Sequence, residues 1–240
     1  MGTLALLAAW GVYRYTDLLA QVPFARALDY LADKLSGVVR QPWAAGMTGA
    51  VIVAVVPAVV CGLLMGLGVF ISWPISVAVV VLCMGPMRLF EIPALGDTAI
   101  EADFQSSLSA ERYHALAARD VIGSLIWAAI LGAPGAVFYR AARELAESPA
   151  QSLQDDSELL SNARLLFGFL YWLPARVYAL AQVACGSGGR LENMLSFSVD
   201  SSVADQLVLT ACGDKNRSVN TGPKAMLVTA LAIAALAYFL

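Results

Sequence analysis

The chain has 240 residues, of which 59% are hydrophobic and 14% are charged, and its mean hydropathy is +0.70. Soluble domains carry about 25% charged residues, so this composition excludes an ordinary soluble domain and predicts an integral membrane protein. The net charge of −3 and the lack of a basic patch argue against nucleic acid as a partner. We expect one membrane domain, residues 1–240, folded as an all-α polytopic bundle of about five to six membrane-associated helices with one amphipathic helix.

Residues 1–42 are expected to form a short N-terminal helix and then an amphipathic helix. The apolar stretch 3–13 is shorter than the ~20 residues that cross a bilayer. It lacks the basic region and cleavage site of a signal peptide. Over residues 24–39, one helical face is apolar and the opposite face carries charges, which favours either an interfacial helix or an ordinary solvated one.

Residues 43–90 are expected to form a hydrophobic helical hairpin. No charged residue occurs between Arg40 and Arg88. The segment Ser72-Trp73-Pro74 is the predicted turn, because proline disfavours helix continuation and tryptophan prefers the membrane interface. Gly62 and Gly66 form a GxxxG spacing, which permits close helix approach either within the molecule or between two copies.

Residues 91–120 are polar and acidic and are expected to form a loop outside the membrane. Its carboxylates, Glu101, Asp103 and Asp120 among them, could bind a metal or act as acid and base, but they match no fixed motif and a solvated loop is the alternative. The only histidine, His114, is expected at the surface. Without a CxxC pair or clustered histidines, the sequence predicts no metal site.

Residues 121–185 are expected to hold two spans joined by an acidic linker over 141–160. Gly132, Pro134 and Gly135 should break or kink the first span, and broken helices are tolerated at membrane depth where they line a cavity. The second span, 165–184, contains Pro174 and Arg176.

Residues 186–224 read as a polar loop, and residues 225–240 as a C-terminal helix. If every span crosses the membrane, eleven Lys and Arg residues, Arg119 among them, lie on one side, and Arg140, Arg143 and Arg164 lie on the other. The positive-inside rule then places the larger group in the cytoplasm.

Two arginines lie beside aromatic residues at the edges of apolar segments: Arg140 follows Tyr139, and Arg176 follows Trp172 by four positions. Charged residues at such places usually have a partner. These four residues are therefore the candidate ligand-binding residues. The arginines either bind an anionic small molecule or pair with acidic residues of the chain.

The same stretch resembles a known superfamily. The segments Gly132-Ala133-Pro134-Gly135-Ala136, Tyr139-Arg140-Ala141 and Trp172-Leu173-Pro174-Ala175-Arg176 are similar to segments of the CobD/CbiB superfamily. That superfamily contains the adenosylcobinamide-phosphate synthases of cobalamin biosynthesis and the AmpE proteins. The similarity is specific over about 50 residues and is only architectural elsewhere.

The chain departs from the synthases where their polar motifs occur. After the tyrosine–arginine pair the synthases have Asn-Thr-Leu-Asp, whereas residues 143–146 are Arg-Glu-Leu-Ala. They carry a Glu-Asn and Asp pattern ahead of this span, whereas residues 117–123 hold one acid, Asp120. They have Ser-Pro-Asn-Ala-Gly-Trp-Pro-Glu after the later helix, whereas residues 196–211 read SFSVDSSVADQLVLTA. An ATP-dependent amide synthase needs carboxylates for Mg²⁺ and donors for phosphates.

The resemblance therefore favours the AmpE branch and implies a multi-pass protein of the bacterial inner membrane. The expected function is that of a non-catalytic sensor or signalling modulator linked to β-lactamase induction and cell-wall recycling, without a cofactor or catalytic residues. Its expected partners are membrane lipid, an anionic small molecule, and a protein partner or second copy. The alternative is a diverged synthase that uses ATP and Mg²⁺ through Glu101, Asp103, Asp120 and Arg140, although the chain has no P-loop motif.

Overall fold

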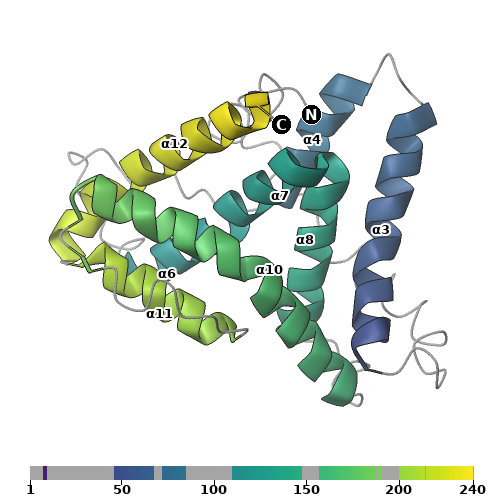
Figure 1. The fold of residues 1–240 in the computed structure, drawn as a ribbon, viewed down its shortest axis with the longest axis horizontal. Coiled ribbons are helices and arrows are strands. Elements are labelled where there is room, and N and C mark those ends of the chain that lie inside the picture. Colours follow the sequence, from purple (N-terminus) through teal and green to yellow (C-terminus); the bar gives the residue numbers. More distant parts are fainter. Residues whose placement is uncertain are drawn as a thin grey trace, which may run out of the picture.

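The computed structural model describes residues 8–9, 46–67, 72–84, 110–147, 157–187, 189–190, 200–213 and 215–239. All regular secondary structure within these ranges is helical, which confirms the predicted fold class at this level (Figure 1). The predicted amphipathic helix and the candidate residues Glu101 and Asp103 lie outside the described residues.

The predicted hydrophobic hairpin corresponds to α3 (Met47–Leu67) and α4 (Ser72–Cys83), neither of which contains a charged residue. The predicted turn at Ser72-Trp73-Pro74 is instead the first turn of α4. Proline is well tolerated there because the first amides of a helix have no intrahelical acceptor. Figure 1 shows α3 at the edge of the molecule, antiparallel to α8 and beside it.

The single span predicted over 121–139 is wrong, because the predicted break at Gly132 is a full reversal of the chain. One continuous helical run ascends through α6 (Ala110–Leu116), the π-helical segment η2 (Ala117–Ile122) and α7 (Gly123–Leu131). Gly132 adopts φ +74°, and α8 (Ala133–Glu147) then packs back against the run. Glycine adopts a positive φ without the steric cost that a Cβ atom would bring, so it is the residue best suited to end a helix in this conformation.

Two further glycines allow the arms of this α7–α8 hairpin to approach closely. A Cβ atom on Gly135 would overlap the backbone carbonyl oxygen of Trp127, and a Cβ on Gly123 would overlap the Tyr139 ring. Gly132, Pro134 and Gly135 correctly predict that the helix is interrupted here. Their spacing alone does not distinguish a kink from a full reversal of the chain.

The reversal also changes the predicted sidedness. The count of Lys and Arg placed Arg119 and Arg143 on opposite sides of a membrane, yet both side chains contact the carboxylate of Glu147. The two arginines therefore lie at the same end of the hairpin, and the eleven-to-three division is wrong for these residues.

The C-terminal half contains more helix than the polarity of the sequence indicated. The longest of the described helices, α10 (Ser157–Ala184), begins inside the predicted acidic linker, and α8 extends into that linker from the other side. The predicted polar loop over 186–224 contains α11 (Ser201–Cys212), and α12 (Lys215–Phe239) begins ten residues before the predicted C-terminal helix. In Figure 1, α11 and α12 lie on either side of the end of α10.

The prediction that His114 lies at the surface is also wrong, since its side chain is 1% exposed. Its Nδ1 atom lies 3.0 Å from the Tyr178 hydroxyl and 3.1 Å from Gln182 Nε2, and Gln182 Nε2 donates to the Tyr178 hydroxyl at 2.8 Å. The physical reason is that His114 belongs to helix α6, which packs against the core, and not to a loop.

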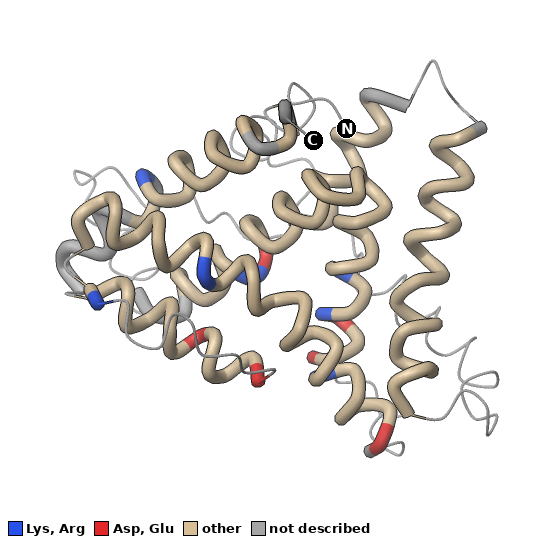
Figure 2. The backbone as a smooth tube through the Cα atoms, in the orientation of Figure 1, with Lys and Arg blue, Asp and Glu red and all other residues tan. Residues whose placement is uncertain are grey.

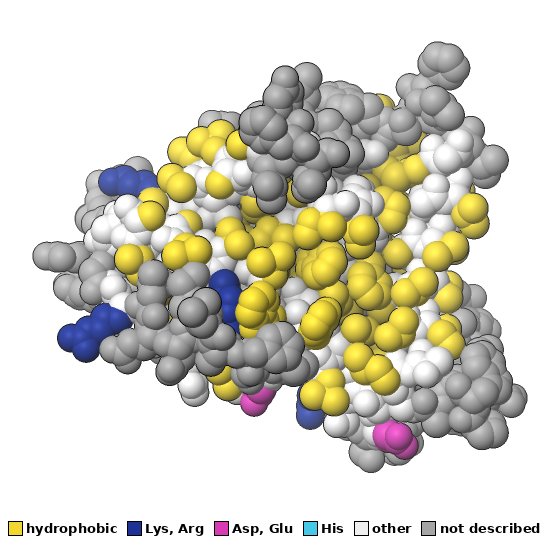
Figure 3. Space-filling view, viewed as in Figure 1, with side chains coloured by type: hydrophobic (Ala, Val, Ile, Leu, Met, Phe, Trp, Pro, Cys, Tyr) yellow, Lys and Arg dark blue, Asp and Glu magenta, His cyan; other side chains and the backbone are white. Residues whose placement is uncertain are grey.

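Large apolar side chains are exposed on the outer faces of α3 and α10. Leu63 and Leu64 are 63% and 64% exposed, and Phe169 is 55% exposed. Figure 3 shows hydrophobic side chains across the middle of the molecule, with charged groups toward one side and the lower edge. Two helical stretches, Met47–Gly66 and Tyr113–Leu131, are long and apolar enough to cross a membrane, although other helices bury most of the second.

Candidate ligand-binding site

Arg140, a candidate from the sequence, has partners within the chain. Its Nη1 atom lies 3.3 Å from Asp120 Oδ1, and its Nη2 atom contacts the carboxylate of Glu144, one helical turn further along α8. The arginine is buried together with Asp120. The sequence left two possibilities for Arg140, namely binding of an anionic molecule or pairing with acidic residues of the chain. The structure shows it paired within the chain.

The other three candidates are not brought together with Arg140. The Tyr139 hydroxyl is buried and donates to the backbone carbonyl of Arg119 at 2.8 Å, so it satisfies an acceptor of the π-helical segment. Arg176 donates to the carbonyl of Trp172 at 3.0 Å, and its guanidinium lies 4.1 Å from the centre of the Trp172 ring. Such an arrangement is a local cation–π pair on α10.

Asp120 is the one candidate carboxylate of the enzyme alternative that the structure describes, and it is enclosed. Its side chain is 3% exposed, and its carboxylate contacts both Arg140 and Arg143. A carboxylate buried to this degree is stable as an anion only when it is paired, and here two guanidinium groups surround it.

Arg119 joins this buried pair to a different helix. Its Nε atom donates to Asp205 Oδ1 at 3.0 Å, its Nη2 atom contacts the second oxygen of Asp205, and its Nη1 atom lies 2.6 Å from Glu147 Oε1. The other oxygen of Glu147 lies 3.2 Å from Arg143 Nη2. Tyr171 of α10 donates to Asp205 at 3.0 Å.

These contacts form a chain of alternating charges, which we call the ion-pair network. It contains the following residues in order of contact: Asp205, Arg119, Glu147, Arg143, Asp120, Arg140 and Glu144. The network links the π-helical segment, α8 and α11, and through Tyr171 it reaches α10. Figure 2 shows α3 and α4 without charge, whereas charged positions gather where α8 and the π-helical segment approach α10 and α11.

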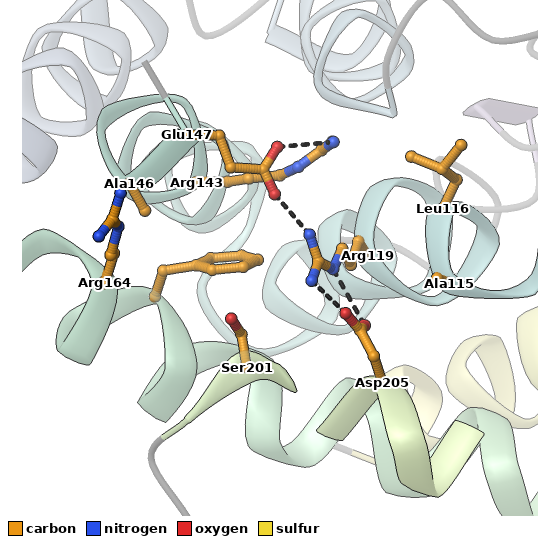
Figure 4. Close-up of a pocket in the computed structure, with 10 residues that line it drawn as sticks. Ala115, Leu116, Arg119, Arg143, Ala146, Glu147, Arg164, Ser201 and Asp205 are labelled. Carbon is orange, nitrogen blue, oxygen red and sulfur yellow. Dashed lines mark hydrogen bonds and ion pairs between the residues drawn. The ribbon is translucent and has the colours of Figure 1, made fainter. Parts of the chain in front are cut away.

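A pocket of about 590 Å³ lies beside the network. Figure 4 shows Arg119 between Asp205 and Glu147 at the pocket, with Arg164 on the opposite wall and the Ser201 hydroxyl directed into the space. The lining residues come from α6, the π-helical segment, α8, α10 and α11: Ala115, Leu116, Arg119, Arg143, Ala146, Glu147, Arg164, Phe167, Ser201 and Asp205. The volume is within the range of about 300–1,000 Å³ typical of small-molecule sites.

Sequence reasoning missed this pocket, although part of it was visible. The pairs Arg140–Glu144 and Arg143–Glu147 have the i,i+4 spacing that places opposite charges together on a helix. The contact between Arg119 and Asp205 spans 86 positions and has no local signal. No group of three or more His, Cys, Asp or Glu side chains among the described residues is arranged to hold a metal ion.

Comparison of the chain with protein-family models, with curated proteins and with solved structures gives no match. The chemistry of the pocket therefore has to be inferred from its own residues.

Proposed function

We propose that the chain is a multi-pass protein of the bacterial inner membrane and acts as a non-catalytic sensor or signalling modulator of the AmpE type. The observation that carries the proposal is the pocket bordered by the ion-pair network, in which Arg119 is shared between carboxylates of two helices. The sequence resemblance supplies the cellular context, which is β-lactamase induction and cell-wall recycling.

The distribution of apolar surface supports the membrane part of the proposal. The outer face of α3 exposes consecutive aliphatic residues, including Leu63 and Leu64, and the helix has no charge over 21 residues. A helix of that length spans about 30 Å at 1.5 Å per residue, which matches the hydrocarbon core of a bilayer. Contiguous apolar faces of this size are unfavourable in water and favourable against lipid.

The environment of Asp120 supports a role without catalysis. A metal-binding or general-base carboxylate must reach its ligand or substrate. Asp120 instead lies within the bundle between Arg140 and Arg143, where the arginines compete for its oxygens. We infer that its charge positions helices and takes no part in a reaction.

The proposed sensing step depends on the ion pairs of Arg119, which connect α8 and α11 at the pocket. A ligand can shift a conformational equilibrium only through different affinities for the two states. An occupant that competes for Arg119 or Glu147 would weaken the connection between α8 and α11, and the helix arrangement would respond to binding.

Genetic complementation tests this function. The chain is expressed in a bacterium that has an inducible β-lactamase and lacks its own AmpE-like protein, and enzyme induction by a β-lactam is measured. We expect the chain to change induction, and Arg119→Gln to abolish the change while the variant still inserts into the membrane. An inserted wild-type chain with no effect on induction would contradict the proposal.

One observation favours the alternative synthase: Glu147 and Asp205 both line the pocket, and carboxylates are the side chains that Mg²⁺ prefers. Expression in a cell that lacks its cobalamin-pathway synthase tests this alternative. Restored cobalamin synthesis would support the enzyme and overturn the non-catalytic proposal.

A further inference from the structure

We propose that the pocket binds one small molecule through a single oxyanion, a carboxylate or a phosphate group, and that Arg164 is the cation that holds it. This inference names the ligand class of the proposed sensor, and it rests on that function for the consequence of binding but not for binding itself.

Arg164 differs from the other arginines of the pocket lining in having no ion pair with a described residue. Three arginines line it (Arg119, Arg143 and Arg164), and two carboxylates do so (Glu147 and Asp205). Arg119 and Arg143 are held by the carboxylates of the network. Arg164 is exposed and forms no ion pair with a residue in the described part of the chain. An anionic group of an occupant could therefore pair with Arg164 without displacing a contact of the ion-pair network.

The geometry gives that anion a second donor beside Arg164. The Ser201 hydroxyl is directed into the pocket (Figure 4). A guanidinium group presents its donors in a planar fork that matches a carboxylate or phosphate, which favours an oxyanion over a halide.

The N-terminus of α11 is not the binding group. Its first turn is already capped, because the Ser202 amide donates to Asp200 Oδ1 at 2.8 Å. Recognition is therefore assigned to the side chains of Arg164 and Ser201. Ala115 and Leu116, which also line the pocket and are partly exposed, offer an apolar surface to the rest of the molecule.

The size of the pocket indicates that the oxyanion is one end of a larger molecule. A volume of about 590 Å³ is much greater than an isolated phosphate or acetate ion fills. The same chemistry occurs in a soluble phosphate monoester or carboxylic acid and in the phosphodiester of an anionic lipid, so the test has an arm for each source.

Binding is measured on the full chain purified in mild detergent. The soluble probes are phenyl phosphate and benzoate, titrated calorimetrically against sodium chloride of equal ionic strength. The lipid probe is phosphatidylglycerol compared with phosphatidylcholine in nanodiscs. Arg164→Gln removes the proposed cation, and Lys224→Gln is the matched control because Lys224 is an exposed cation that does not line the pocket.

We expect at least one oxyanion probe to bind, Arg164→Gln to weaken it at least tenfold, Ser201→Ala to weaken it by a smaller factor, and Lys224→Gln to leave it unchanged. If Arg164→Gln weakens binding of the soluble probes, the ligand is a soluble molecule. If it weakens binding of phosphatidylglycerol alone, the ligand is a lipid headgroup. No binding by any probe, or equal weakening by both charge variants, overturns the inference. Binding without an effect on β-lactamase induction would reject the proposed function and leave the ligand class standing.

Discussion

At the scale of single residues, the stability of the fold depends on charged side chains that each contact more than one oppositely charged partner. Asp120 contacts two arginines, and Glu147 also contacts two. Breaking a buried pair by removing one partner costs more than the pair contributes, because the other charge stays buried without compensation. The buried members of the network, Asp120, Arg140 and Arg143, are therefore the ones most sensitive to substitution.

Asp120→Asn tests this sharing. The variant leaves Arg140 and Arg143 facing a neutral amide, and we expect it to lower the free energy of unfolding by about 3–5 kcal/mol. Adding Arg143→Gln should cost much less in the Asp120→Asn background than in the wild type. Thermal or denaturant unfolding of the four proteins in detergent gives the coupling energy, and additive effects would show that the two residues do not interact.

Part of this network could be predicted at the residue scale. The internal pairing of Arg140 was one of the two expectations, because charges at the edges of apolar segments find partners within the bundle. The pairing of Arg119 with Asp205 could not be predicted, since the two residues are 86 positions apart and α11 was read as part of a polar loop.

At the scale of elements, the reversal at Gly132 positions the site. It brings Arg140 and Arg143 of α8 back to the π-helical segment that carries Arg119 and Asp120. A straight or merely kinked span over the same residues would place these charges far apart. The glycines of the α7–α8 hairpin therefore position the site, although none of them lines the pocket.

Gly135→Ala tests the hairpin. The added methyl group would overlap the carbonyl oxygen of Trp127, which is backbone and cannot move without shifting α7. We expect a loss of about 1–3 kcal/mol in the free energy of unfolding, as for other overpacked sites. Gly66→Ala is the control, because nothing lies within 4 Å of its added Cβ, and alanine should there be neutral or stabilising by up to about 1 kcal/mol. Equal effects of the two substitutions would contradict the packing described for the hairpin.

The cap of α11 has a predictable dependence on pH. The Ser202 amide donates to the Asp200 carboxylate and lowers the pKa of Asp200 below its usual value of 3.8. A carboxyl group with a lowered pKa in the folded state stabilises that state above pH 3.8, and this stabilisation is lost as the pH falls through the lowered pKa.

Asp200→Asn keeps a capping side chain without the charge. We therefore expect the stability of this variant to fall less steeply than that of the wild type as the pH is lowered below 3.8. Melting temperatures of both proteins across the acid range measure it. If the two acid limbs coincide, the cap does not contribute to the pH dependence.

Polar helices are the elements that sequence reasoning missed. Hydropathy identifies long apolar runs, and it located α3 and much of α10 and α12 correctly. It does not identify α6 and α11, which mix polar and apolar residues. These helices are stabilised by packing, α11 against α10 and α6 against α11 and α12. The burial of His114 follows from the same packing.

At the scale of the whole molecule, apolar and charged regions are separated. The exposed aliphatic residues lie on α3 and on the outer faces of α10 and α12. The ion-pair network and the pocket lie where α8 and the π-helical segment meet α10 and α11. In a bilayer this arrangement would place the pocket toward one aqueous side.

Cysteine labelling tests that arrangement. Arg164→Cys and Ser201→Cys both place a thiol at the pocket, in a background where Cys61, Cys83, Cys185 and Cys212 are replaced. We expect a membrane-impermeant maleimide to reach both thiols from the same side of sealed vesicles of one orientation. Labelling from opposite sides would show that α10 and α11 do not meet as described.

Native mass spectrometry of the chain purified in mild detergent tests the central claim most directly, namely that the pocket beside the ion-pair network is a binding site and not a catalytic one. The account predicts that the wild-type chain carries an adduct with a carboxylate or phosphate group, that Arg164→Gln loses it, and that Lys224→Gln keeps it. An adduct of Mg²⁺ and nucleotide, or an adduct that Arg164→Gln retains, would contradict the account.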